Sequence, residues 1–183
     1  MAISFERVKV VTDRVALAKK GDKDAFIFLI HENKTNLYRV AMAMLKNQAD
    51  AEDAIQMTIM KAYEKIGRLK KNLYFKTWLI RILINQCNDT LRAKKKVISL
   101  DNMNREFGGY EDSYKDLDVQ DAIYSLKEEL RLVTVLFYYE DITTKEISKL
   151  LKIPEGTVRS RLSTARSTLQ KLLQIIDENK GRD

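Results

Sequence analysis

Two reactive residue types are nearly absent from this 183-residue chain, which contains one cysteine, Cys87, and one histidine, His31. A single cysteine excludes an intramolecular disulfide and favours a reducing compartment. Without a second histidine or a neighbouring cysteine, His31 supports neither a metal site nor a histidine-based catalytic dyad. We therefore expect no metal, no cofactor and no catalytic residue.

Long apolar runs are also absent. No stretch approaches the roughly 18 apolar residues of a membrane-spanning helix, and the N-terminus lacks a long apolar core followed by a cleavage site. The sequence predicts a cytoplasmic protein without membrane insertion.

Helix-breaking residues are scarce, at one proline and six glycines. Apolar residues recur three or four positions apart over long stretches, which is the spacing of one face of a helix. The sequence predicts an all-α protein in which two small helical domains are joined by a flexible acidic linker. The expected boundaries are an N-terminal tail over 1–14, a first domain over 15–96, the linker over 97–118 and a second domain over 119–183.

Charge is spread unevenly along the chain. The net charge of +7 divides into +10 for residues 1–96, −5 for residues 97–121 and +2 for residues 122–183. The basic first block favours a polyanion as partner. The middle block contains Gly108 and Gly109 and has no sustained period, which is typical of a linker.

The segment from Lys70 to Lys96 has two different faces, and we expect Asn72 to cap a long helix there. One face is an apolar stripe that should pack against neighbouring helices, made of Ile80, Leu83, Ile84, Cys87 and Leu91. The other face holds Trp78, Arg81, Asn85, Asn88 and Arg92, preceded by Tyr74 and Phe75 and followed by Lys94, Lys95 and Lys96.

This second face combines a stacking surface, amides and cations. Such a combination suits unpaired nucleotides, because stacking on an aromatic side chain contributes roughly 1 to 3 kcal/mol per base. The face therefore predicts a site for single-stranded DNA. The alternative interpretation is an amphipathic core helix whose solvated side happens to carry a tryptophan.

Another helix is expected from Asp50, as its N-cap, to Gly67. Its buried face should hold Ala51, Ala54, Ile55, Thr58, Ile59, Ala62, Tyr63 and Ile66. The outward face should hold Asp53, Gln56, Met57 and Met60. Methionines on a polar face are typical of partner-binding surfaces, so these four residues predict a protein docking site. The alternative is a solvent-exposed surface that binds no partner, with Met60 in contact with a neighbouring helix.

The second domain should contain a helix-turn-helix. A short helix capped by Thr143 or Thr144 is followed by a turn at residues 152–155 and then by a longer helix. The solvent side of this longer helix should hold Arg159, Ser160, Ser163, Thr164 and Arg166, which we predict to contact duplex DNA. Lys149, Lys152 and Arg161 are expected on backbone phosphates.

Three segments together resemble bacterial RNA polymerase sigma factors of the extracytoplasmic-function (ECF) group. They are DAEDAIQMTIMKAY, FKTWLIRILINQCND and TTKEISKLLKIPEGTVRSRLSTARSTL, in that order, and the resemblance covers residues 20–96 and 119–175. In that family the first domain docks on the clamp of core RNA polymerase and captures the melted minus-10 element. The second domain reads the minus-35 duplex and touches the polymerase flap.

The resemblance assigns roles to individual residues. It implies that Asp53 and Gln56 meet the clamp, although Met57 stands where the family often has an acidic residue. Trp78 matches the aromatic residue of the melting region, and Asn85 a position that helps hold a flipped base. Arg159 and Ser160 match positions that contact the minus-35 bases.

The resemblance also implies an initiation subunit without an active site of its own. Its expected partners are core RNA polymerase, through clamp and flap, and promoter DNA, both duplex and melted. An anti-sigma factor is a further expected partner. From charge and resemblance together, the acidic linker is expected to thread toward the RNA path of the polymerase.

Other classes of protein fit parts of the sequence. An operator-binding repressor or activator would use the final helix-turn-helix, but it would not need the Trp78 face or the outward methionines. A nucleic-acid-processing enzyme would need convergent carboxylates, and the cluster of Asp50, Glu52 and Asp53 offers no such pocket. An all-helical adaptor without DNA would leave the charge layout unexplained.

Overall fold

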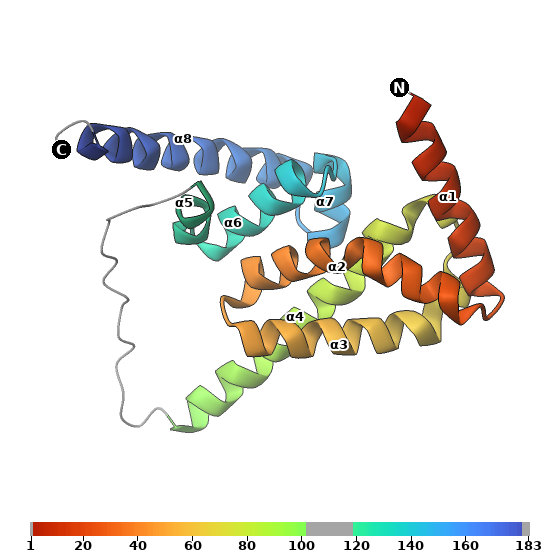
Figure 1. The fold of residues 1–183 in the computed structure, drawn as a ribbon. Helices are drawn as coiled ribbons and strands as arrows, with labels where there is room; N and C mark the ends of the chain where they lie inside the picture. Colours follow the sequence, from red (N-terminus) through yellow and green to blue (C-terminus); the bar gives the residue numbers. More distant parts are fainter. Residues whose placement is uncertain (1, 102–118, 181–183) are drawn as a thin grey trace. The chain divides into compact units, whose positions relative to one another are not determined.

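The computed structural model describes residues 2–101 and 119–180, and every element in these two stretches is helical. The all-α prediction is confirmed. The chain divides into two compact units, Met1–Arg92 and Ala93–Asp183 (Figure 1). Residues 102–118, most of the predicted linker, lie outside the described residues.

The first unit contains three α-helices, two short 3₁₀ segments and most of a fourth α-helix, whose last residues lie beyond the boundary at Arg92. In chain order these are α1 (Ala2–Lys19), α2 (Lys23–Leu45), α3 (Gln48–Lys65), η1 (Ile66–Arg68), η2 (Asn72–Tyr74) and α4 (Phe75–Asp101). Helix α4 continues to Asp101, so residues 97–101 are helical although the sequence assigns them to the linker.

Helix α1 begins at Ala2, whereas the sequence predicts an N-terminal tail over residues 1–14 and a first helical piece only near Asp13–Lys20. No glycine or proline precedes Gly21, so the chain lacks a signal that would stop the helix earlier. Val15 and Ala18 are buried where α1 packs on α2. Val10 and Leu17 stay exposed on other sides, and this scatter of apolar residues hides the helical period in the sequence.

Polar side chains start α2 and α3. Asp22 caps α2, and its side chain accepts a hydrogen bond from the Ala25 backbone N–H at 2.9 Å. Helix α3 is capped by Asn47, whose side chain accepts from the Asp50 N–H at 3.0 Å. The prediction of Asp50 as the cap is wrong, because an equally good capping residue stands three positions earlier.

Asn72 does not cap α4, which begins three residues later at Phe75. The Asn72 side chain is engaged by α1 instead. Its Nδ2 donates to the Thr12 carbonyl at 3.2 Å, and its Oδ1 accepts from Lys19 Nζ at 3.3 Å. The predicted cap is wrong because this tertiary contact uses the capping group.

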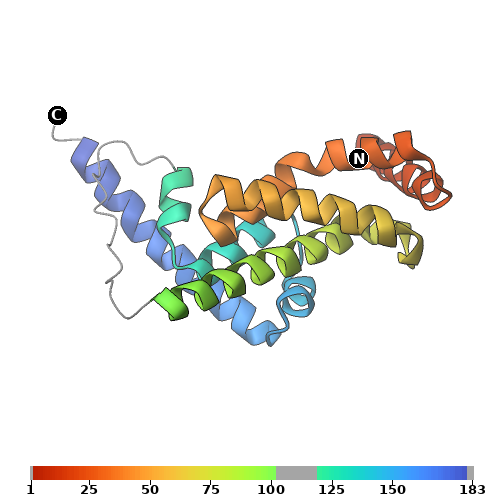
Figure 2. The ribbon, with the colours of Figure 1, turned by 90° about the horizontal axis from the view of Figure 1, so that it is seen from below.

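The core of the first unit contains the predicted apolar stripe of α4. Ile80, Leu83, Ile84 and Cys87 are buried, Leu91 is half-buried, and α1, α2 and α3 supply further core side chains. Fully burying one such leucine stabilises the fold by about 1.5 to 3 kcal/mol. Helix α4 crosses α3 obliquely (Figure 1 and Figure 2), and Lys61 Nζ of α3 donates to Gln86 Oε1 of α4 at 2.8 Å.

The second unit is built on one long helix. Its elements are α5 (Val119–Ser125), α6 (Glu128–Thr134), the π-helical segment η3 (Val135–Tyr139), α7 (Thr144–Leu151) and α8 (Glu155–Lys180). Helices α5, α6 and α7 each pack against α8. The buried Arg131 ties α5 to α6, because its Nη1 donates to the carbonyls of Leu126 at 2.7 Å and Tyr124 at 3.2 Å.

The predicted helix, turn and longer helix are confirmed as α7 and α8. Thr143 caps α7 in a capping box with Glu146, so both side chains satisfy backbone N–H groups of the first turn. Lys152 ends α7 in the left-handed region at φ 56°. The Ser148 hydroxyl donates to the Ile153 carbonyl at 2.6 Å and fixes the turn that aims α8.

Candidate nucleic-acid and protein interfaces

The face of α4 opposite the core is open to solvent. Four residues of this face are exposed, namely Arg81, Asn85, Asn88 and Arg92. The fifth, Trp78, is half-buried. Because the spacing of 3, 4, 3 and 4 follows the helix repeat, the five side chains lie in one row along α4. The structure thus brings together the indole, amides and guanidinium groups that the sequence placed on one surface.

Phe75 does not belong to this surface. Its ring is only 1% exposed and lies 5.9 Å from the Trp78 ring, centroid to centroid. A side chain that fills the core cannot stack on a base, so the prediction of Phe75 as a DNA contact is wrong. Its aromatic character, which suggested stacking, serves packing and supports the indole of Trp78.

Tyr74, in contrast, is 45% exposed, and the neighbouring Leu73 is 62% exposed. Lys71 Nζ lies 6.0 Å from the centroid of the Tyr74 ring, a cation–π distance. Leu73 and Lys71 were missed by sequence reasoning. They precede α4 in a 3₁₀ turn, where no helical period could indicate their exposure.

The cations at the end of the row are held loosely. Arg92 Nη2 pairs with Asp89 Oδ1 at 2.8 Å, and both side chains are more than half exposed. Such surface pairs contribute about 0 to 1 kcal/mol, so a phosphate can displace the carboxylate at little cost. The next cations along α4, Lys94, Lys95 and Lys96, are exposed as well.

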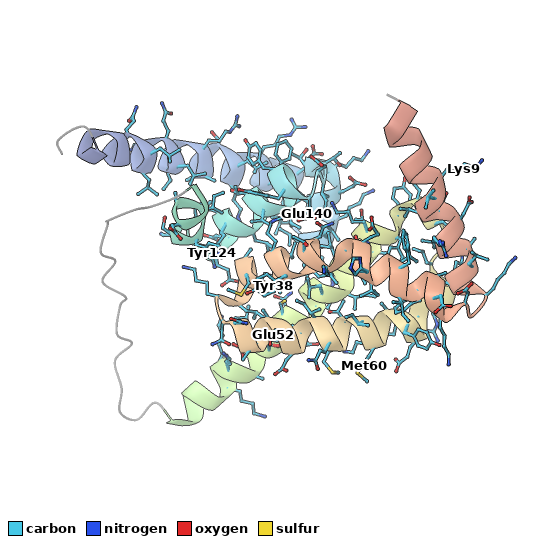
Figure 3. The ribbon with its side chains drawn as sticks, in the orientation of Figure 1. Lys9, Tyr38, Glu52, Met60, Tyr124 and Glu140 are labelled. Atoms are coloured by element: carbon cyan, nitrogen blue, oxygen red, sulfur yellow. The ribbon has the colours of Figure 1, made fainter. Side chains whose placement is uncertain are left out.

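The outer face of α3 presents the predicted docking residues. Asp53 and Gln56 are exposed, together with Met57 at 45% and Met60 at 58%. Figure 3 shows Met60 projecting from α3 into solvent, so no neighbouring helix of the unit covers it. Apolar thioethers in water on an otherwise polar face are the property expected of a surface that a partner covers.

Tyr63 extends this methionine face instead of joining the core. The sequence predicts it as buried, yet it is 47% exposed. Its ring meets Phe26 of α2 edge-on, with centroids 5.1 Å apart. The prediction is wrong because a tyrosine at the margin of a helix face can pack one edge and leave its hydroxyl in water.

The solvent side of α8 holds the predicted duplex-contacting residues. Arg159, Ser160, Ser163, Thr164 and Arg166 are all exposed there. At the first turn, Glu155 Oε1 accepts from Thr144 Oγ1 and from Arg159 Nη2, both at 2.8 Å. These bonds, the Thr144 bond first, lower the pKa of the Glu155 carboxyl.

Arg161 faces a different direction from Arg159. Its Nη2 pairs with Glu129 Oε2 of α6 at 2.9 Å, and its side chain is 27% exposed. The pair joins α8 to α6, a structural use that the sequence did not indicate. A contact of Arg161 with a phosphate stays a prediction.

A groove of about 550 Å³ lies between η3 and the second half of α8. It is lined mainly by apolar side chains, with Tyr138, Tyr139, Leu169 and Leu173 among them. The π-helical turn of η3 places the two consecutive tyrosines at the surface, 49% and 36% exposed. Nothing in the sequence period indicated this second apolar surface.

Metal ligands do not converge anywhere in residues 2–101 and 119–180, where no group of three His, Cys, Asp or Glu side chains could hold an ion. Within the same stretches, none of the helices has both the length and the apolar character needed to cross a membrane.

Comparison with known proteins places both units in families. Residues 29–97 match Sigma-70 region 2, and residues 116–169 match Sigma-70, region 4. The ECF RNA polymerase sigma factor SigW of Bacillus subtilis (strain 168) is 32% identical over 90% of this chain and 97% of its own length. The RNA polymerase sigma factor SigV of the same organism is 32% identical over 80% of this chain and 90% of its own length.

Solved structures show the same fold. The sigma factor RpoE of Bartonella quintana, solved in complex with the anti-sigma factor NepR, aligns with a TM-score of 0.68 at 24% identity over 82% of this chain and 97% of its own. CnrH, solved with the cytosolic domain of CnrY, aligns with a TM-score of 0.64 at 20% identity over 91% of this chain and 98% of its own.

Proposed function

The chain belongs to the ECF RNA polymerase sigma factors, the initiation factors of transcription, and we propose that it directs core polymerase to promoters through their minus-35 and minus-10 elements and promotes melting. The observation that carries this proposal is the row on α4, in which a half-buried indole, two amides and two guanidinium groups share one surface.

The row favours melted DNA for an energetic reason. Pulling a base from the stack costs a few kcal/mol, and the cost is lowest at flexible or unpaired steps. Trp78 would stack on an extruded base and Asn85 would hydrogen-bond its edge, and both contacts form only after opening. The protein therefore shifts the equilibrium toward the open state without consuming fuel. Cations at the end of the row add affinity that depends on salt.

The second unit would supply the duplex contact. Helix α8 would enter the major groove with its N-terminal residues on base edges, as the second helix of a helix-turn-helix does. Arg159 can make a bidentate contact to guanine, and Ser160, Ser163 and Thr164 can meet bases or phosphates. Arg161 and Arg166 would contact phosphates beside them.

Two further surfaces would meet core polymerase. The clamp would cover Asp53, Gln56, Met57 and Met60 on α3, because their mixture of exposed thioethers and polar groups suits a protein partner. The groove between η3 and α8 would receive an apolar segment of the flap, since its lining is mostly apolar.

An anti-sigma factor is proposed as a further partner. The support is the RpoE structure, which was solved with such a protein bound. By covering the surfaces that polymerase uses, an anti-sigma factor would hold the protein inactive in the cytoplasm. The chain itself would act as a DNA-binding subunit without an active site, a metal or a cofactor.

The acidic segment is proposed to run toward the RNA path of the polymerase, where its negative charge would mimic nucleic acid. Its residues Asp112, Asp116 and Asp118 lie outside the described residues. Replacing these three residues and Asp101 with asparagine should alter early RNA synthesis and leave promoter binding unchanged. Unaltered initial synthesis would remove this part of the proposal.

The proposed function is tested with purified core polymerase and a promoter identified by run-off transcription on a promoter library. We expect W78A/N85A to lose most promoter opening while keeping minus-35 duplex binding. Tyr38→Ala is the matched control, because Tyr38 is an exposed aromatic on α2 (Figure 3). Full opening by W78A/N85A would overturn the melting role. Tight, specific duplex binding without polymerase would instead favour a conventional repressor.

A further inference from the structure

Helix α1 is bonded to the short loop 69–74 that leads into α4. Lys19 Nζ donates to the Leu69 carbonyl at 2.8 Å and to Asn72 Oδ1 at 3.3 Å. Asn72 Nδ2 in turn donates to the Thr12 carbonyl at 3.2 Å. These three bonds join residues 50 to 60 positions apart in the chain, so they are tertiary contacts and not features of one helix.

The loop has a fixed inner side and a presented outer side. On the inner side, Leu69 and Phe75 are 6% and 1% exposed and fill the core. On the outer side, Leu73 and Tyr74 are exposed, and Lys71 lies over the Tyr74 ring. The loop backbone between these two sides is what Lys19 and Asn72 hold.

We propose that Lys19 and Asn72 are positioning residues of the single-strand site, which fix the loop so that Tyr74 continues the row begun by Trp78. Helix α1, which touches no base itself, then forms part of the DNA-capturing machinery. This inference rests on the proposed function of the α4 row. It adds the two residues that hold the loop before α4, and with it Tyr74, in place.

The chemistry of the two side chains suits this task. An ammonium group has three donors and no acceptor, so one lysine can serve a backbone carbonyl and an amide oxygen at once. Asn72 accepts and donates, and it thereby relays the contact to the backbone of α1. With the loop held in advance, DNA binding does not have to order it, which is the advantage of preorganisation.

The neighbouring Lys20 provides a matched control. It is exposed and carries the same charge one position later, and no hydrogen bond to the loop is found for it. K20M therefore removes an equal charge from the same end of α1 without touching the loop. K19M removes the donors and keeps an unbranched apolar stem, and N72A removes the relay without changing charge.

The test uses the full chain with core polymerase and a promoter carrying a fluorescent base analogue in its minus-10 segment. We expect K19M and N72A each to lower promoter opening by about fivefold to tenfold, as loss of a charged or relayed hydrogen bond does. K20M should behave as the natural protein does. Binding to a minus-35 duplex should be equal in all variants, and K19R, which keeps donors, should restore part of the opening.

A coupling measurement separates positioning from general stability. If Lys19 acts through the loop, K19M should have little additional effect on opening once Tyr74→Ala is present. An equal factor in both backgrounds would overturn the inference, and so would normal opening by both K19M and N72A. If W78A/N85A impairs opening while K19M and N72A do not, only this inference fails. Normal opening by W78A/N85A removes the proposed melting role on which this inference rests.

Discussion

One carboxylate oxygen in the first turn of α8 holds two partners. Glu155 Oε1 accepts from Thr144 of α7 and from Arg159, so the guanidinium group that we propose to contact DNA is already oriented in the free protein. The Glu155–Arg159 pair is exposed and contributes little to stability. Its value lies in orientation, because a side chain with many rotamers loses less entropy on binding when it is already directed.

This arrangement predicts a measurable pKa change. The Thr144 bond is the main cause of the lowered pKa of Glu155, so Thr144→Val should raise that pKa toward its ordinary value. Because the folded pKa is lowered, the bonds are fully present above the ordinary pKa and are lost as pH falls through the lowered one. An NMR titration of the Glu155 carboxyl measures the shift. Thr168→Val, farther along α8, serves as control, and an unshifted Glu155 would contradict the assignment.

Cys87 provides a second prediction for a single residue. Burial raises the pKa of its thiol to about 12, so almost no thiolate exists at pH 8. We expect the folded protein to react with a thiol reagent orders of magnitude more slowly than the urea-unfolded chain. Absorbance after addition of a disulfide reagent measures both rates. Equal rates would show that the core around α4 opens readily.

The sequence predicts single residues well where a helical period applies. Trp78, Arg81 and Asn85 lie on the predicted open face, because their spacing alone decides it. Phe75 and Tyr63 were misplaced, since an aromatic residue at the margin of a face can turn either way. The DNA and polymerase roles of the correctly placed residues stay predictions.

Helices begin where local polar groups satisfy the first backbone N–H groups. Thr143, one of the two caps that the sequence predicts, begins α7, and Glu146 bonds back to it. Thr143→Ala should destabilise α7 by about 1 kcal/mol. Hydrogen exchange of the Ile147 amide, which bonds to the Thr143 carbonyl, should then be faster by about fivefold. Ser163→Ala on α8 is the control, and unchanged exchange at Ile147 would contradict the cap.

Elements without a period could not be predicted. The N-terminal part of helix α1, before the predicted helical piece Asp13–Lys20, was missed because its apolar residues are scattered. Asn72 was assigned as a cap because its bonding partner Thr12 lies 60 positions away, where no local sequence pattern indicates it. The π-helical η3 needs one additional residue per turn, and no residue type marks that insertion. For α1 and Asn72, a contact between distant segments decided the structure.

For the whole molecule, one chain carries two DNA-facing units. Joining them makes the second contact effectively intramolecular, so weak single contacts add up to a strong one. The family match covers both units, which is why the order of the segments identified the class from the sequence. Composition alone would have allowed a repressor.

Substitutions in the two units should therefore impair different steps, duplex binding for the second unit and promoter opening for the first. Arg159→Ala should weaken minus-35 duplex binding about tenfold or more, because a bidentate contact to guanine contributes about 1 to 3 kcal/mol. At saturating protein and polymerase, opening by this variant should recover. Trp78→Ala should bind with normal affinity and open poorly at saturation. Titrations that record bound and open fractions separately measure this, and loss of both properties in either variant would contradict the division.

Helix α4 also sets a length. From Trp78 to Arg92 it rises about 21 Å, at about 1.5 Å per residue. Along one DNA strand, steps of about 3.4 Å would fit roughly six times into that span. A hydrogen-bonded helix does not stretch, so in the proposed function α4 would act as a ruler laid beside the exposed strand. A promoter with one nucleotide too many in this interval would have to loop that nucleotide out, and the ruler would reject it without reading any base.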